Sequence, residues 1–285
     1  MREGFLEPGY LWRHAVIWLC IVFAVAPVLW VISASFNPAN TIIGQRLIPR
    51  EPSFANYRLL FSDPQHPFGL WMWNTVKLSL ITALLVVSIT SLAAYAFSRF
   101  RFRGRRTGLF AILLIQMFPQ MLAMVAIYLL LFWVGDYIPS LGLNSHGGLM
   151  FVYLGGAMGV NVWLMKGYFD TIPTSLEEAA TMDGATPFQA FYKIILPLSR
   201  PILAVVFFLQ FMATYSEYVL ARVLLSSNDK LTMAVGLQIF VADQYAKRWG
   251  VFSAAALIGA IPILLLFAFL QRQLVSGLTR GAVKG

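Results

Sequence analysis

Long apolar stretches separated by shorter polar segments dominate the hydrophobicity pattern of this chain. A helix needs about 20 mostly apolar residues to cross the hydrocarbon core of a bilayer. The stretches that meet this requirement predict six spanning helices, at 14–35, 73–98, 108–134, 148–165, 201–224 and 251–270. We therefore expect an all-α, multi-pass membrane protein in which residues 1–285 form a single transmembrane domain.

Composition and charge support a membrane protein over a soluble one. The chain is 59% apolar and 12% charged, whereas soluble domains are about 25% charged. Thirteen of the 21 Lys and Arg residues fall on the side that holds both termini, which predicts cytoplasmic termini. The strongest local signal is five arginines between residues 99 and 106, which we expect to lie near anionic lipid. This placement accounts for much of the net charge of +9 without a nucleic-acid partner.

Residue types that carry chemistry are sparse. The single cysteine, Cys20, lies in an apolar run, and the three histidines are too scattered to predict a metal site. No Gly-rich stretch ends in Gly-Lys-Ser/Thr, so we expect no ATP site in this chain. We therefore predict a protein that is not an enzyme and that holds no cofactor of its own.

The predicted cytoplasmic loop 166–200 contains two short helix signatures in series, which we call the elbow. Ser175 and Glu178 have the spacing of a capping box, and Gly184 follows where a helix would end in a left-handed residue. Thr186-Pro187 predicts the start of a second helix that stops before Pro197. Such short helices need a surface to pack on. Composition leaves open whether that surface is lipid or a groove in a partner.

The same loop resembles the EAA signature of bacterial ABC importer permeases. It matches every fixed position of that pattern: Glu178, Ala179, Ala180, Gly184, Ile194, Leu196 and Pro197. The resemblance implies the type I importer permease fold and an elbow that couples to a cytoplasmic ATPase. Glu178 would then pair with a basic residue of that ATPase.

The resemblance extends over the whole chain, which is similar to the carbohydrate branch of these importers. It includes Pro27–Trp30, Phe54-x-Asn56-Tyr57 and the Ala94–Arg99 segment, which reads AYAFSR. The ending, 277–285, looks like that of the second permeases of maltose, maltodextrin and trehalose importers. In that family the tail reaches the ATPase dimer, which implies contacts from Gly281, Val283 and Lys284.

The resemblance also implies the partners of this chain. They are a second permease subunit, a cytoplasmic ATPase dimer that binds ATP and Mg²⁺, an external sugar-binding protein and the lipid of the bacterial inner membrane. The chain itself would be a transporter subunit that forms part of the path for a sugar.

Polar residues inside predicted spans are candidates for lining that path. The candidates are Gln116, Gln120, Asn161, Gln210, Tyr215 and Glu217. An interhelical hydrogen bond for the glutamines, or an interfacial position for Glu217, remains an alternative. The outer loop 225–250 contains Phe240, Tyr245 and Trp249, which would contact the binding protein or form an interfacial aromatic belt.

Other functions remain as alternatives. A permease for another solute, such as glycerol phosphate, would favour basic residues in the path, and no Lys or Arg is central in a predicted span. A stand-alone secondary transporter predicts inverted repeats, and none is evident. A membrane enzyme would need a nucleophile–base pair or a metal cluster, and the sequence suggests neither.

Overall fold

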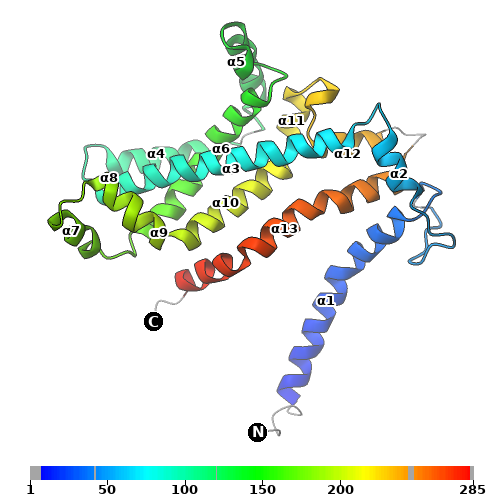
Figure 1. The fold of residues 1–285 in the computed structure, drawn as a ribbon, viewed down its shortest axis with the longest axis horizontal. Coiled ribbons are helices and arrows are strands. Elements are labelled where there is room, and N and C mark those ends of the chain that lie inside the picture. Colours follow the sequence, from blue (N-terminus) through cyan, green and yellow to red (C-terminus); the bar gives the residue numbers. More distant parts are fainter. Residues whose placement is uncertain (1–7, 42, 120, 243–246, 283–285) are drawn as a thin grey trace. The chain divides into compact units, whose positions relative to one another are not determined.

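The computed structural model describes residues 8–41, 43–119, 121–242 and 247–282, and all regular structure in these ranges is helical (Figure 1). The elements are α1 (Pro8–Ser35), α2 (Ala55–Ser62), α3 (Phe68–Arg99), α4 (Arg105–Met117), α5 (Met124–Tyr137), η2 (Pro139–Leu141), α6 (His146–Phe169), α7 (Ser175–Met182), α8 (Pro187–Ala190), η3 (Phe191–Ile195), α9 (Leu196–Leu198), α10 (Arg200–Tyr215), α11 (Val219–Leu224), η4 (Asn228–Lys230), α12 (Met233–Ala242) and α13 (Trp249–Ala282).

Several of these helices are long and apolar enough to cross a membrane. Within the described ranges four qualify by length and composition: Trp12–Ser35, Phe68–Arg99, His146–Phe169 and Trp249–Val275. A fifth span arises if Pro187–Leu198 and Arg200–Tyr215, which are bent by 77° at Ser199, are counted together. The all-α membrane class is confirmed, while the count of six spans and the side of the termini stay predictions.

The predicted continuous helix over 108–134 is wrong. The helical path ends at Met117 and resumes at Met124. Pro119 favours the break, because proline disfavours the helical conformation for the residue before it. Phe118 accordingly adopts an extended conformation, with φ of −72° and ψ of 125°.

The predicted helix over 201–224 is also interrupted. It ends at Tyr215, and a separate short helix, α11, begins at Val219. The carboxylate of Glu217 accepts hydrogen bonds from the backbone N–H groups of Leu220 and Ala221, at 2.8 and 3.0 Å. This side chain therefore satisfies the first N–H groups of a new helix instead of lying along an unbroken one.

The chain divides into two compact units, and the first comprises residues 1–69 and 236–261. In this unit the side chain of Asn56 is buried, and its amide donates to the carbonyl oxygens of Ser35 and Asn37, both at 2.9 Å. The hydroxyl of Tyr57 donates to Ser35 Oγ at 2.8 Å. The Phe54-x-Asn56-Tyr57 segment thus fastens α2 to the end of α1.

The second unit comprises residues 70–235 and 262–285. Figure 1 shows α7 and α8 at one end of α3 and α6, with α11 toward the other end of α3. An apolar cluster joins α3, α6, η3 and α10 at the α7 end: Ala94, Tyr95, Met165, Phe169, Ile172, Phe191, Ile195 and Val206. A second cluster packs Ile202 and Val205 of α10 against Leu274 of α13. The first cluster thus packs η3, which follows α8, against α3, α6 and α10.

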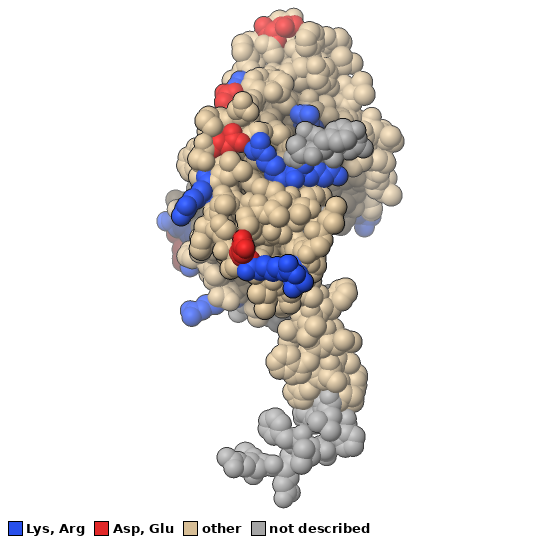
Figure 2. Space-filling model, turned by 90° about the vertical axis from the view of Figure 1, so that its right-hand side faces the viewer, with Lys and Arg blue, Asp and Glu red and all other residues tan. Residues whose placement is uncertain are grey.

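Charged side chains are sparse on the surface. On the face drawn in Figure 2, Lys, Arg, Asp and Glu are separated by broad areas of uncharged residues. Many large apolar side chains are exposed in α1 and α5, including Trp18, Phe23 and Trp133. Such surfaces suit a lipid environment or a helical partner better than water.

Candidate functional site

The elbow consists of α7, the turn after it, and α8 with its continuation through η3 and α9. Gly184 has a φ of +85°, which confirms the predicted left-handed residue. Thr186 and Gln189 form a capping box, with Thr186 N–H donating to Gln189 Oε1 at 2.8 Å and Gln189 N–H donating to Thr186 Oγ1 at 3.2 Å. The predicted box at Ser175 is wrong, because α7 begins at Ser175 itself and follows Thr174 without a side-chain cap.

The residues that match the EAA signature lie along both parts of the elbow. Glu178 and Ala179 are exposed, and Ala180 is half-buried. Met182 and Phe188, on the same two helices, are 89% and 67% exposed. The elbow therefore exposes both a carboxylate and large apolar groups.

The second half of the elbow continues further than expected. A π-helical turn, η3, follows α8, and the helical path runs through Pro197 to Leu198, so the predicted stop before Pro197 is wrong. Proline lacks the N–H that would bond four residues back, and the wider π turn precedes that position. Ile194 and Leu196 are half-buried and Pro197 is exposed.

The inner side of the elbow is tied to α3 by an ion pair that sequence reasoning missed. Arg99 Nε donates to Glu177 Oε1 at 2.5 Å, and the two side chains are 10% and 12% exposed. The hydroxyl of Tyr95 donates to Glu177 Oε2 at 2.8 Å. Arg99 and Glu177 are 78 residues apart in the chain, so no local spacing indicates their contact. The AYAFSR segment was noted in the sequence, but its partner was not.

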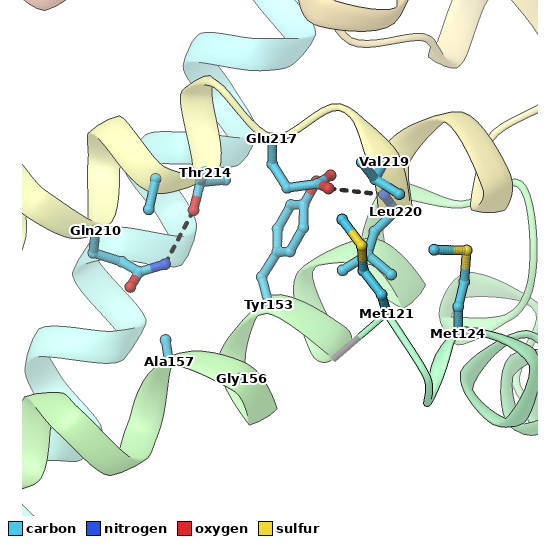
Figure 3. Close-up of a pocket in the computed structure, with 11 residues that line it drawn as sticks. Met121, Met124, Tyr153, Gly156, Ala157, Gln210, Thr214, Glu217, Val219 and Leu220 are labelled. Atoms are coloured by element: carbon cyan, nitrogen blue, oxygen red, sulfur yellow. Dashed lines mark hydrogen bonds between the residues drawn. The ribbon is translucent and has the colours of Figure 1, made fainter. Parts of the chain in front are cut away.

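A cavity of about 270 Å³ lies in the second unit, between α6, the α10–α11 break and the segment before α5 (Figure 3). Its lining residues are Met121, Met124, Tyr153, Gly156, Ala157, Gln210, Ala213, Thr214, Glu217, Val219 and Leu220. Two candidates for the translocation path, Glu217 and Gln210, are among them. Both helix breaks that the pattern did not predict border this cavity.

Tyr153 and Glu217 meet on one side of the cavity. Figure 3 shows the ring of Tyr153 rising from α6 toward the carboxylate of Glu217, which its hydroxyl contacts at 2.6 Å. Gln210 Nε2 donates to Thr214 Oγ1 at 3.1 Å along α10. Hydroxyl, carboxylate and amide groups thus stand beside the thioethers of Met121 and Met124, a mixture suited to a polar ligand with apolar faces.

The other path candidates lie elsewhere in this unit. Gln116 lines a second cavity of about 520 Å³, and its Nε2 donates to the carbonyl oxygen of Gly156 at 2.7 Å. Asn161 donates to Ala157 O at 2.8 Å within its own helix. Tyr215 is buried and its hydroxyl lies 3.8 Å from Met233 Sδ. Gln120 lies outside the described residues.

The candidate docking residues belong to the first unit. Phe240 is 3% exposed and its ring centroid lies 5.4 Å from that of His66, whereas Trp249 is half-buried. The N–H of Trp249 donates to the carbonyl oxygen of Asn40 at 3.3 Å. Tyr245 lies outside the described residues, as do Val283 and Lys284 of the tail, while Gly281 lies in the last turn of α13.

Asp63 organises the charges near these residues. Its carboxylate pairs with His66 Nδ1 and with Arg248 Nη1, both at 2.9 Å, and accepts from the N–H of Gln65 at 3.0 Å. Burial alone would raise the pKa of Asp63, but the hydrogen bonds from His66, Arg248 and Gln65 together hold that pKa below its usual range. The ionised carboxylate thus fastens the start of α13 to the end of α2.

The part of the chain that matches a known protein family includes both the elbow and the cavity. Residues 87–280 match the family described as the binding-protein-dependent transport system inner membrane component. This range includes α7, α8 and every residue that lines the cavity.

Curated relatives extend the similarity to nearly the full length. The chain is 46% identical over 283 residues to the maltose/maltodextrin transport system permease protein MalG of Vibrio vulnificus, covering 95% of both chains. It is 45% identical to the protein of the same name from Escherichia coli K12, again over 95% of both.

A solved structure agrees with the fold. A chain in the crystal structure of a bacterial ABC transporter that imports the acidic polysaccharide alginate aligns with a TM-score of 0.76 and 25% identity. The alignment covers 92% of this chain and 95% of the other. The expected ABC importer permease fold is therefore confirmed.

Proposed function

Because this chain belongs to the family of binding-protein-dependent transport system inner membrane components, we propose that it forms one half of the path of an ATP-driven importer of maltose, maltodextrin or a related sugar. It is a transporter component of the bacterial inner membrane and spans that membrane several times. The observation that carries the proposal is the 46% identity over 95% of both chains to a protein named as a maltose/maltodextrin permease.

The lining of the cavity supports a neutral sugar. Its described lining residues include one carboxylate, Glu217, three amide or hydroxyl side chains at Tyr153, Gln210 and Thr214, and no Lys or Arg. A phosphorylated solute such as glycerol phosphate would be better served by basic groups. Because the hydroxyl groups of a sugar both donate and accept hydrogen bonds, a mixture of acceptors and donors suits them.

Energy for transport would come from a partner. This chain would hold no cofactor, and ATP and Mg²⁺ would bind to a cytoplasmic ATPase dimer. The exposed outer side of the elbow, with Glu178, Ala179 and Gly184, would seat in a groove of that ATPase, and the tail with Gly281, Val283 and Lys284 would reach the same partner. A second permease would complete the path, and an external sugar-binding protein would deliver the sugar near Phe240, Tyr245 and Trp249.

Reconstitution in vesicles tests this function directly. The chain is co-expressed with its companion permease and ATPase, and uptake of radiolabelled maltose and maltotriose is measured with the binding protein outside and ATP inside. We expect uptake that requires every component. Uptake by the chain alone, without a nucleotide-hydrolysing partner, would contradict the proposal.

A further inference from the structure

Two adjacent glutamates of α7 have different surroundings. Glu178 is exposed on the outer side of the elbow, whereas the side chain of its neighbour Glu177 is 12% exposed. Successive residues of a helix point about 100° apart, so neighbouring carboxylates can serve different contacts. The structure therefore separates an outward carboxylate from an inward one.

Each oxygen of the inward carboxylate has its own partner on α3. Oε1 of Glu177 accepts from Arg99 Nε at 2.5 Å, and Oε2 accepts from the hydroxyl of Tyr95 at 2.8 Å. Hydrogen bonds to ionised groups are stronger than neutral ones and hold their partners in a defined orientation. The pair is therefore a directional connection and not only a close packing of side chains.

The same end of α3 contacts the elbow at further points. Arg99 Nη2 donates to the carbonyl oxygen of Ile172 at 2.9 Å, just before α7. The hydroxyl of Tyr95 lies 3.2 Å from the carbonyl oxygen of Pro187, at the start of α8. The ring centroids of Tyr95 and Phe191 are 4.8 Å apart. One turn of α3 thus contacts the segment before α7, the start of α8 and the start of η3.

These contacts matter because α3 is distant from the elbow along the chain. The elbow is joined covalently to α6 before it and α10 after it, so a displacement of the elbow pulls on those two helices directly. α3 has no such connection. A displacement reaches α3 as a defined movement only if a rigid contact carries it, because close-packed elements move between discrete arrangements.

Resting on the function proposed above, we propose that Glu177, held by Arg99 and Tyr95, links the elbow to α3 and carries the ATPase-driven movement of the elbow into that helix. Glu178 serves the partner on the outer side, and Glu177 serves this chain on the inner side. Glu177 and Arg99 are positioning residues, since neither needs to touch the sugar.

The test uses the whole reconstituted importer with maltose as the transported sugar. Three variants are compared with the wild type: Glu177→Gln, which weakens the link, the charge exchange R99E with E177R, which restores an opposite-charge pair, and Asp136→Asn. Asp136 is the matched control, because it is an exposed acidic residue of α5, outside the elbow, whose side chain forms no hydrogen bond or ion pair within the described residues. Co-purification of the ATPase shows that each complex has assembled.

The decisive readout is sugar transported per ATP hydrolysed. We expect Glu177→Gln to lower this ratio about 5-fold or more, which is the lower end of typical coupling factors between sites. The charge exchange should recover part of the loss, and Asp136→Asn should keep the wild-type ratio. An assembled Glu177→Gln complex with an unchanged ratio overturns the link, and the wild-type complex still tests the importer function separately.

A distance measurement provides a second readout. Spin labels at Leu92→Cys on α3 and Thr181→Cys on α7, in a Cys20→Ser background, report their separation with and without ATP trapped by vanadate. We expect the separation to stay constant in the otherwise wild-type complex and to change in Glu177→Gln. If the separation changes in the presence of intact Glu177, the elbow moves independently of α3 and the proposal is wrong.

Discussion

The hydroxyl of Tyr153 in α6 donates a hydrogen bond of 2.6 Å to Glu217 at the break between α10 and α11. The same carboxylate accepts from the N–H groups of Leu220 and Ala221. One side chain therefore begins a helix, joins two elements and lines the cavity. A group with three hydrogen bonds is held in one position, which favours a defined polar surface for a passing ligand.

Tyr153→Phe should lower the free energy of unfolding but leave the chain folded. The change removes one donor to an ionised acceptor, which typically costs about 1.5–3 kcal/mol of unfolding free energy. Glu217→Gln should cost more, since a single amide oxygen replaces two carboxylate oxygens that accept from three groups. Thermal unfolding in detergent and maltose uptake measure the two effects. Equal stability and uptake in both variants and the wild type would contradict this account.

Gly148 and Gly155 of α6 should respond oppositely to alanine. A Cβ at Gly148 would lie 2.4 Å from the carbonyl oxygen of Gly142, and backbone cannot easily move away. We expect Gly148→Ala to destabilise the chain by about 1–3 kcal/mol. A Cβ at Gly155 meets nothing within 4 Å in the described chain. Gly155→Ala should stabilise the helix by about 0.5–1 kcal/mol, as thermal unfolding of the isolated chain would show.

Local signals predicted part of the elbow: the left-handed Gly184 and the helix start at Thr186-Pro187 were found, whereas the box at Ser175 and the stop before Pro197 were wrong. The two correct features depend on residues within a few positions, so their spacing contains the information needed. The breaks inside 108–134 and 201–224 were missed for different reasons. Pro119 was a signal for a helix break, but the long apolar run around it led to the prediction of a continuous helix. At Glu217 the helix is interrupted, and the carboxylate accepts from the backbone N–H groups of Leu220 and Ala221. Hydrophobicity does not encode such a contact.

Contacts between distant segments could not be predicted from the pattern. Arg99 belongs to an arginine cluster whose plain interpretation is a topology signal, and nothing local marks Glu177 as its partner. The predictions for the aromatic residues of the outer loop, contact with the binding protein or an interfacial belt, also rested on local pattern alone. Phe240 is buried against His66, because an aromatic side chain in a loop packs wherever a neighbouring segment offers apolar surface.

Acid should loosen the contact between Asp63 and Arg248. The pKa of Asp63 is lower in the folded chain than its ordinary value of 3.8, so folding favours the ionised form. Its contribution to stability is therefore complete above about pH 4 and is lost as the pH falls through the lowered pKa. The melting temperature of Asp63→Asn should lie below that of the wild type at neutral pH, and the gap should narrow in acid. Asp136→Asn, at an exposed position, is the matched control and should show no such gap.

Removal of residues 277–285 should lower ATP hydrolysis by the partner ATPase but leave membrane insertion of this chain intact. Deletion of 277–285 should lower binding-protein-stimulated ATP turnover, because the tail is proposed to reach the ATPase. Insertion should be retained, since the contacts of α13 with α10 involve Leu270 and Leu274, before the deleted segment. Turnover of the purified complex is compared with that of a complex lacking only 283–285. Full stimulated turnover after the longer deletion would show that the tail is inert.

Gly184→Asp should abolish transport while leaving the chain in the membrane. Gly184 has a φ of +85°, and a Cβ there would meet nothing within 4 Å in the described chain. The cost is therefore conformational, about 1–2 kcal/mol for a left-handed residue, which is too small to unfold the protein. This strain falls on the turn that sets the angle between α7 and α8, and the new carboxylate would sit on the outer side of the elbow next to the proposed ATPase groove.

Uptake and ATP hydrolysis by reconstituted complexes measure the loss of transport in Gly184→Asp. Gly184→Asn is the matched control, because asparagine has nearly the same shape, carries no charge and tolerates a left-handed conformation, so it should retain much of the activity. Normal uptake by Gly184→Asp would show that neither the geometry nor the charge of this turn matters for coupling.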